Sequence, residues 1–284
     1  MAWVKEAFPV GISRACRIIG MSRSQWYYRS RKDDSEVVAK LEELSERFST
    51  QGFPMYYHRI RLEGLKWNHK RVRRVYRKMG LNLRRKKKRR LPERVKEPLA
   101  IPETINHTWS MDFMSDSLVG GRKFRCLMLI DDYNRECLHI ETDTSLPSVR
   151  VIRMLEQTLE WRGKPQRIRV DNGPEFIAKV MKQWCRDKKI KLLFIQPGKP
   201  TQNAYVERFN GSFRRDVLDA WMFSSLRQVR QLAEEWRVDY NNFRPHKALG
   251  YLPPRVYSGA LDRPPNPQAG LFIMDNKQQR NCLI

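Results

Sequence analysis

The chain carries two hydrophobic periods, and the clearer one predicts strands in its second half. Apolar and polar residues alternate over 108–115, which puts the apolar side chains on one side and the polar ones on the other. A period of two is typical of a strand with one covered face. Shorter apolar runs follow at 124–130 and 136–142, with turn residues between them. We expect these three segments to pair as an antiparallel meander.

Helical periods alternate with further strands after this meander. Apolar residues recur every three or four positions over 148–161 and again over 174–184, and short apolar strands are expected at 168–171 and 190–195. Three meander strands followed by strand–helix–strand units predict an α/β domain, with a mixed five-stranded sheet and flanking helices. A further helix is expected over 203–218.

The first third predicts small all-α units. Ser13 and Ser22 are placed to cap two short helices, with Gly20 turning the chain between them. This spacing suits a helix-turn-helix, in which Arg23 and Gln25 would be exposed early residues of the second helix and would contact DNA. A plain helical hairpin fits the same residues.

A second helical unit is expected over 56–81. Its apolar stripe would face a small core, and its opposite face carries more cations than solvation alone requires.

Composition indicates nucleic acid as the partner. The 284 residues include 56 Lys and Arg against 31 Asp and Glu, a net charge of +25. Residues 1–100 hold 27 Lys and Arg against 10 Asp and Glu, so the first third carries most of the excess. Such a balance favours a polyanionic partner, with nucleic acid first and an anionic membrane surface second, and double-stranded DNA is the expected partner.

The densest positive charge lies just after the helical units. Seven consecutive cations stand there: Arg84, Arg85, Lys86, Lys87, Lys88, Arg89 and Arg90. Prolines follow and like charges repel, so 84–105 is predicted to be a basic, Pro-containing linker that contacts DNA phosphates. A solvated tail or, in a eukaryote, a nuclear-import signal is the alternative.

The sequence argues against membrane and disulfide-rich classes. The longest apolar run, 126–130, is far shorter than the ~20 residues that a spanning helix needs, and the N-terminus lacks the apolar stretch of a signal peptide. Five cysteines with no CxxC spacing fit free thiols in a reducing compartment. We therefore expect a cytoplasmic protein.

Acidic residues occupy unusual places in the predicted sheet. Asp112 lies within one strand and Asp171 ends another, although aspartate is disfavoured in strands. In the 203–218 helix, polar residues align in one narrow row beside the apolar stripe. That row consists of Asn203, Glu207, Asn210 and Arg214. It belongs either to a functional site or to a surface face that includes an acid by chance, and the pattern leaves both open.

Three blocks carry a resemblance to a known family. Residues 109–113 read WSMDF, 170–176 read VDNGPEF and 202–210 read QNAYVERFN; these resemble the signature blocks of retroviral-integrase-type DDE recombinases. Thirty-five residues separate Asp171 from Glu207, as in that superfamily.

Two further blocks narrow the resemblance. Residues 240–246 read YNNFRPH and 249–254 read LGYLPP, similar to the end of the catalytic domain in bacterial insertion-sequence transposases. The chain most resembles the downstream-frame (orf B) product of two-frame insertion sequences, and the resemblance runs from about residue 9 to residue 257.

The resemblance implies a ribonuclease-H-like core in which Asp112, Asp171 and Glu207 are the catalytic, metal-binding carboxylates. Hard oxygen ligands favour Mg²⁺ or Mn²⁺, and two such ions suit phosphodiester chemistry. The implied activity is that of a DNA transposase, which cleaves transposon ends and joins their 3′-hydroxyls to DNA. Arg214 matches a family position that contacts the DNA end, and Asn203 matches a supporting position. No His-His-Cys-Cys spacing is present, so no zinc is expected.

Other titratable residues receive structural interpretations. Asp131 and Asp132 are expected to enter a turn, and Asp116 is expected to lie in a loop. Glu175 would sit in the first turn of a helix, where an acid favours the helix dipole. His246 is expected to pack or to cap.

The predicted organisation has four parts. These are a helical DNA-binding region at 1–83, the linker at 84–105, the integrase-like core at 106–258 and a tail without assigned role at 259–284. The resemblance further implies a homo-oligomer on DNA, nucleoid association, and an upstream-frame companion protein or frameshift fusion. Two alternatives stay open: a catalytically inactive DNA-binding regulator, and a structure-specific nuclease on the same fold.

Overall fold

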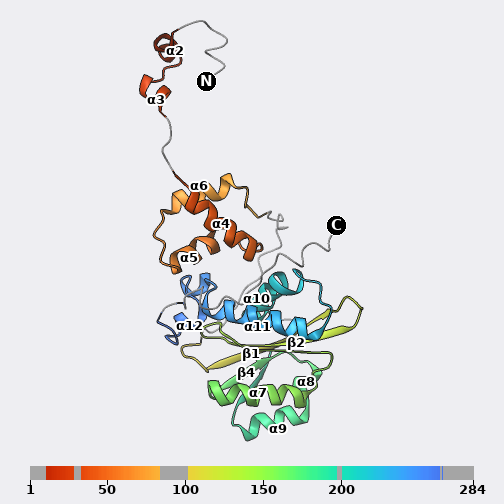
Figure 1. The fold of residues 1–284 in the computed structure, drawn as a ribbon. Coiled ribbons are helices and arrows are strands. Elements are labelled where there is room, and N and C mark those ends of the chain that lie inside the picture. Colours follow the sequence, from red (N-terminus) through yellow and green to blue (C-terminus); the bar gives the residue numbers. More distant parts are fainter. Residues whose placement is uncertain (1–10, 29–32, 84–101, 197–199, 263, 265–284) are drawn as a thin grey trace.

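A computed structural model describes residues 11–28, 33–83, 102–196, 200–262 and 264 of the chain (Figure 1). The run of cations at 84–90 and almost all of the tail lie outside the described residues, so the predicted phosphate contacts of the linker stay a prediction.

A helical region precedes the sheet. Its helices are α2 (Ile12–Ile18), α3 (Arg23–Tyr27), α4 (Ser35–Arg47), α5 (Phe53–Leu62) and α6 (His69–Lys78). Ser22 caps α3, because its Oγ accepts from Gln25 N at 3.2 Å while Gln25 Oε1 accepts from Ser22 N at 3.3 Å. Helix α4 was not among the predicted elements. It packs with α5 and α6 around a separate small core that includes Val37, Ile60 and Val75.

The catalytic-core candidate contains five strands and the helices between and after them. Its elements are β1 (Thr108–Ser117), β2 (Lys123–Asp131), β3 (Cys137–Asp143), α7 (Ser148–Arg162), β4 (Arg167–Val170), α8 (Pro174–Ile177), α9 (Lys179–Asp187), β5 (Lys191–Phe194), the 3₁₀ helices η1 (Pro200–Asn203) and η3 (Lys247–Leu249), α10 (Ala204–Phe213), the π-helical turn η2 (Arg214–Leu218), α11 (Leu226–Asn242) and α12 (Pro254–Tyr257).

The sheet has the order β3-β2-β1-β4-β5. The pairs β1–β2 and β2–β3 are antiparallel, whereas β1–β4 and β4–β5 are parallel. This arrangement confirms the predicted mixed five-stranded sheet. Because β1 and β4 are parallel neighbours, with Ser110 opposite Arg169, the acids that follow these two positions come to the same part of the sheet.

Helices cover both faces of the sheet, with α10 and α11 on one side and α7, α8 and α9 on the other (Figure 1). Alternate strand residues enter the two cores. Cys126 and Met128 pack on the α10–α11 side, and Leu127 and Leu129 pack on the α7–α9 side. Side-chain alternation along β2 therefore builds both layers from one strand.

Four predicted details differ from the structure. Ser13 does not cap the first helix, because α2 begins at Ile12 after Gly11 and already includes Ser13. The helix expected over 174–184 is broken at Ala178, which has extended backbone torsions and separates α8 from α9. The helix expected over 203–218 widens into a π-helical turn from Arg214. The expectation that Asp116 lies in a loop was wrong, because β1 continues to Ser117 and pairs Asp116 with Phe124. In the described part of the chain, none of the helices has both the length and the apolar character to cross a membrane.

Candidate active site

Asp112 lies in the middle of β1, on the face that α10 covers. Its Oδ1 accepts from the backbone N–H of Phe113 at 2.8 Å, and its Oδ2 accepts from Asn210 Nδ2 at 2.8 Å. Both carboxylate oxygens are therefore held by donors, one from the strand itself and one from the helix above it. The predicted alternation is confirmed, because Trp109 and Met111 enter the opposite core.

Asp171 immediately follows β4, the parallel neighbour of β1. Gly173 N donates to Asp171 Oδ1 at 3.0 Å, which holds the carboxylate against the turn that starts α8. A Cβ on Gly173 would lie 3.0 Å from that same oxygen and 3.4 Å from Glu175 Oε2. The backbone φ of −60° is open to any residue, so a larger residue at this position would be felt through its contact with the Asp171 carboxylate rather than through the backbone.

Glu207 lies in the first turn of α10, and burial raises its pKa. Burial also raises the pKa of Asp112 to about 6, and the negative charges of Asp171 and Glu207 add to that rise. Two of the three acids predicted from the sequence thus act electrostatically on the third, Asp112. Among the described side chains, however, no three His, Cys, Asp or Glu residues are arranged as a complete metal-ligand group.

Asn210 is a residue of this site to which the sequence analysis assigned no role. It belongs to the predicted polar row on α10, one turn beyond Glu207, and is buried. Its Oδ1 makes no hydrogen bond to other described residues, and neither does the buried Oδ1 of Asn203. Its helical phase with Glu207 was the signal that could have identified it.

Arg214 continues the polar row toward the end of β1. Its Nη2 donates to Ser115 O at 3.1 Å, and its Nη1 lies 3.8 Å from carboxylate oxygens of Asp116 and Asp219. The Arg214 side chain stays partly exposed beside these two aspartates. Its predicted contact with the DNA end stays a prediction.

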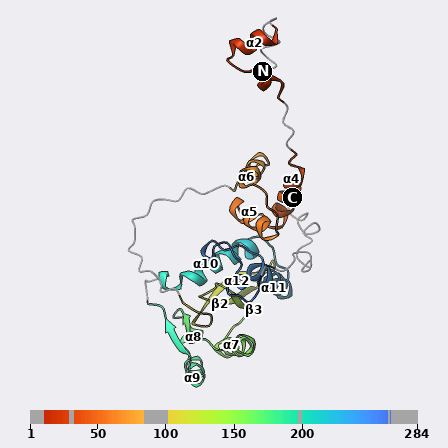
Figure 2. The same ribbon diagram turned by 90° about the vertical axis from the view of Figure 1, so that its left-hand side faces the viewer.

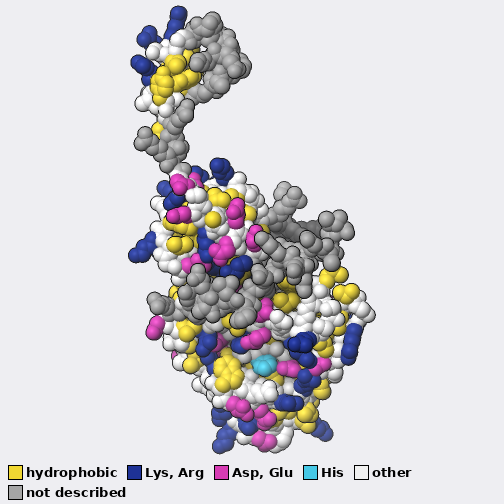
Figure 3. Space-filling model, in the orientation of Figure 1, with side chains coloured by type: hydrophobic (Ala, Val, Ile, Leu, Met, Phe, Trp, Pro, Cys, Tyr) yellow, Lys and Arg dark blue, Asp and Glu magenta, His cyan; other side chains and the backbone are white. Residues whose placement is uncertain are grey.

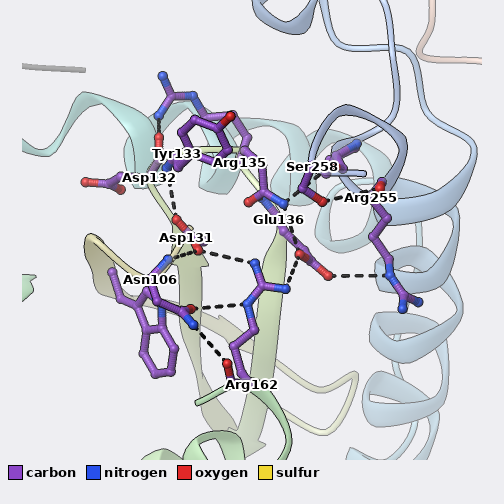
Figure 4. A network of polar contacts seen from close by, with 12 residues as sticks. Asn106, Asp131, Asp132, Tyr133, Arg135, Glu136, Arg162, Arg255 and Ser258 are labelled. Carbon is purple, nitrogen blue, oxygen red and sulfur yellow. Dashed lines mark hydrogen bonds and ion pairs between the residues drawn. The ribbon is translucent and has the colours of Figure 1, made fainter. Parts of the chain in front are cut away.

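A buried ionic network lies at the other end of β1, where β2 ends (Figure 4). Arg162 pairs with Asp131 at 3.3 Å and with Glu136 at 2.9 Å, and Arg169 pairs with Asp132 at 2.7 Å. The structural interpretation of the two aspartates is confirmed. The turn accounts for their position, and the two arginines account for their burial, since a buried carboxylate needs a partner charge.

Three comparisons describe what this chain is similar to. Family models described as "Integrase core domain" match residues 102–200 and 188–254, and one described as "HTH-like domain" matches 32–89. The "Insertion element IS407 uncharacterized 31.7 kDa protein" of Burkholderia multivorans is 39% identical over 260 residues, which cover 91% of this chain and 94% of that protein.

This chain belongs to the family of insertion-element proteins with an integrase core domain. "Transposase InsD for insertion element IS2A/D/F/H/I/K" of Escherichia coli is 26% identical over 273 residues, covering 87% of this chain and 90% of that protein. A solved structure of the HTLV-2 integrase catalytic core domain in complex with magnesium matches with a TM-score of 0.43 at 20% identity, covering 53% of this chain and 95% of that one.

The HTH-like match in this insertion-element protein falls on α4, α5 and α6 rather than on the predicted helix-turn-helix of the first 28 residues. Lys70, Arg73, Arg77 and Lys78 are exposed on α6. Figure 3 shows Lys and Arg side chains over this helix, at the upper edge of the unit formed by α4, α5 and α6. Arg23 and Gln25 are exposed on α3, as expected, although the Gln25 side chain also caps that helix.

The other titratable residues that the sequence analysis considered, Glu175, His246 and the cysteines, have structural roles. Glu175 accepts a hydrogen bond from Arg125, whose guanidinium lies over the Phe113 ring. His246 packs edge-on against Tyr240, and its Nε2 donates to Tyr240 O at 3.3 Å, which confirms the packing interpretation. The four described cysteines are buried free thiols.

Proposed function

We propose that this chain is a DNA transposase in which Asp112, Asp171 and Glu207 hold divalent metal ions for cleavage of transposon ends and for strand transfer. One observation carries the proposal. The strands that carry Asp112 and Asp171 are parallel neighbours, and the helix that carries Glu207 also donates to Asp112 through Asn210, so three acids gather in one part of the fold and two of them raise the pKa of the third. The membership in the integrase-core family supports the same conclusion.

The donor set suits a hard divalent cation. Carboxylates that share a partly buried place repel one another, and a cation relieves that repulsion. Carboxylate oxygens are ligands that Mg²⁺ and Mn²⁺ prefer. When bound, two such ions activate the attacking oxygen and stabilise the leaving oxygen of a phosphodiester displacement.

The contribution of the protein's own residues is orientation. Phe113 N and Asn210 Nδ2 occupy one lone-pair direction on each oxygen of Asp112, which leaves the remaining directions for a ligand. Gly173 N holds Asp171 in the same way. A water molecule is the nucleophile for cleavage, and the resulting 3′-hydroxyl is the nucleophile for joining. No Ser or Tyr side chain of the protein is required to form a covalent bond to DNA.

The test uses three isosteric variants, Asp112→Asn, Asp171→Asn and Glu207→Gln. Each is expected to abolish metal-dependent cleavage and joining while DNA affinity stays unchanged. Asp116→Asn is the matched control, because it removes a carboxylate from the same strand and should leave the chemistry intact. Asp132→Asn is a poor control, since it takes the buried partner charge away from the half-buried Arg169.

Separate cleavage and joining assays distinguish the alternatives. A chain that cuts transposon ends but never joins a pre-cut 3′-end to target DNA is a nuclease. A chain that binds DNA and does neither is a regulator. The expected DNA contact of Arg214, the homo-oligomer and the upstream-frame companion stay predictions of the sequence.

A further inference from the structure

The HTH-like unit of α4, α5 and α6 contacts the core through α5, which lies between α6 and the core in two perpendicular views (Figures 1 and 2). One buried ion pair lies within this contact. The guanidinium of Arg59 forms a two-pronged pair with Asp239 on α11: Nη1 donates to Oδ1 at 2.9 Å and Nη2 donates to Oδ2 at 2.7 Å. Both residues are buried. They are 180 positions apart in the sequence.

Arg59 is held in this position from its own unit as well. Its Nε donates to Gln51 Oε1 at 3.1 Å, and its guanidinium carbon lies 3.7 Å from the centre of the Phe48 ring. These contacts within its own unit therefore orient the Arg59 guanidinium toward Asp239. A preoriented guanidinium loses little side-chain entropy when it forms a bidentate pair, so the contact is geometrically specific.

Two further contacts surround the pair. Thr50 Oγ1 donates to Asp216 Oδ1 at 2.5 Å, and the rings of His58 and Tyr251 stack 3.6 Å apart with an interplanar angle of 10°. Asp216 is itself fixed in the core, because its Oδ2 accepts from Trp236 Nε1 at 3.2 Å and also accepts from Arg244. Three separate points of contact fix a rotation as well as a distance.

The core side of this contact is continuous with the active-site helix. Asp216 lies in the π-helical turn that directly extends α10, the helix of Glu207 and Asn210. Helix α11 presents Asp239 to Arg59, and its neighbouring residues Trp236 and Tyr240 pack edge-on against Phe209 of α10. The HTH-like unit is thus seated on the elements that position the catalytic acids.

We propose that the Arg59–Asp239 pair is an interdomain anchor, which fixes the HTH-like unit on the catalytic core and thereby sets how far along DNA the cut falls from the bound sequence. The inference rests on the proposed function. Exposed cations on α6 lie on the far side of the anchor and stay available to phosphate. Arg59 and Asp239 are positioning residues, because their side chains contact each other, and Arg59 also contacts Gln51 and Phe48.

The experiment compares four full-length proteins: wild type, Asp239→Asn, Arg59→Lys and the control Glu234→Gln. The control removes one carboxylate from the same helix, where Glu234 pairs with Arg237 at the surface. Small-angle scattering of the DNA-free proteins measures whether the two units stay together. Footprinting and cut-site mapping on one transposon-end duplex measure the bound sequence and the cleaved phosphodiester.

Asp239→Asn is expected to raise the radius of gyration, to leave the footprint affinity within about twofold of wild type, and to spread the cuts over neighbouring phosphodiesters, with roughly a tenfold loss at the wild-type position. Arg59→Lys should give a smaller effect in the same direction, because an ammonium cannot form the fork. Glu234→Gln should match wild type. A merely structural role would lower yield without moving the cut.

An unchanged radius of gyration together with a single, unmoved cut position in Asp239→Asn would overturn the anchor. A melting curve for each variant reports whether it is folded, and Arg59→Lys keeps the test decisive if Asp239→Asn is not. Failure of the wild-type chain to cut any DNA would count against the proposed function alone, because the scattering comparison judges the anchor without DNA.

Discussion

Asn210 Nδ2 donates a hydrogen bond to Asp112 Oδ2 at 2.8 Å, across the space between α10 and β1. The contact joins a strand acid to a helix amide that lies 98 positions later in the sequence. Asn210 lies one turn beyond Glu207, so a single helix supplies both an acid to the site and a donor that orients the acid on the strand.

Replacing Asn210 with Ala is expected to lower the rates of cleavage and joining by about 10- to 100-fold, the usual effect of losing a partner that orients a metal-binding side chain. DNA affinity should stay the same, because the amide faces the protein. Single-turnover assays at saturating DNA measure the effect. Ser212→Ala on the same helix is the control, and equal rates in the two variants would remove Asn210 from the site.

Gly173→Ala tests the turn that holds Asp171. The new methyl group would lie 3.0 Å from Asp171 Oδ1, closer than an ordinary contact, so the carboxylate must move. We expect loss of most cleavage activity with a nearly unchanged melting temperature, because the backbone torsions at this position suit alanine. Gly211→Ala is the matched control, since its nearest neighbour is the flexible end of Arg215. Full activity in Gly173→Ala would show that Asp171 need not be held there.

Divalent metal should stabilise the folded chain. With ~10 mM Mg²⁺ and a Kd of ~1 mM, the expected gain is about 1.4 kcal/mol, or roughly 2–4 °C in Tm for a chain of this size. Ca²⁺ should stabilise the protein similarly, since it accepts the same ligands, but should support little chemistry. Asp112→Asn should show little of the rise in thermal melts. Equal shifts in both proteins would mean that the ions bind elsewhere.

His246 should make the protein less stable in mild acid. Burial lowers the pKa of His246 from its ordinary 6.5 to about 3. The unfolded chain therefore takes up a proton below pH 6.5 that the folded chain refuses, and stability falls as pH drops from 6.5 toward 3. At pH 5 this term is about 2 kcal/mol by the linkage relation.

His246→Phe removes that titration and keeps a ring against Tyr240. The variant should be slightly less stable than wild type at pH 8, because it loses the bond to Tyr240 O, and should become the more stable protein near pH 5. Urea unfolding at both pH values measures this crossover. The difference between the two proteins is the informative quantity, since burial raises the pKa of Asp132 to about 6 and acts in the opposite direction. Parallel pH profiles would contradict the prediction.

The cations of α6 should contribute to DNA affinity through phosphate. Replacing Arg73 and Arg77 with Gln is expected to weaken binding to every duplex alike and to reduce the slope of log K against log salt by about 0.9 for each phosphate that is no longer neutralised. Titrations at several salt concentrations measure this slope. Arg71 and Arg74 are suitable comparison positions, because both already pair with Asp34. An unchanged slope would place the DNA on another surface.

Local pattern was sufficient to predict most of the elements of the core. The alternation around Asp112 and the helical stripes before and after Asp171 are short-range signals, and each reports a face that must be covered. The polar row on α10 was readable for the same reason, since a fixed angle per residue aligns Glu207 with Asn210. Helices α4 and α11 were missed, and so was the break at Ala178.

Contacts between distant segments could not be read in this way. Nothing local to Asp131 or Asp132 indicates that arginines of α7 and β4 will neutralise them, because those partners are chosen by strand order. The same holds for the hydrogen bond between Asn210 and Asp112, which depends on how α10 packs against β1.

The order of amino acids was enough to specify most segments and the charge imbalance, because each of these depends on neighbouring residues or on composition. The three acids were singled out by their place in blocks that resemble a known family, since the local pattern alone left their role open. The donors that hold those acids and the seat of the HTH-like unit were settled by packing in three dimensions. Arg59 and Asp239 are 180 positions apart, and their pairing depends on two separately formed cores coming together. Such a contact forms only when the two units pack together, so no pattern of neighbouring residues along the chain predicts it.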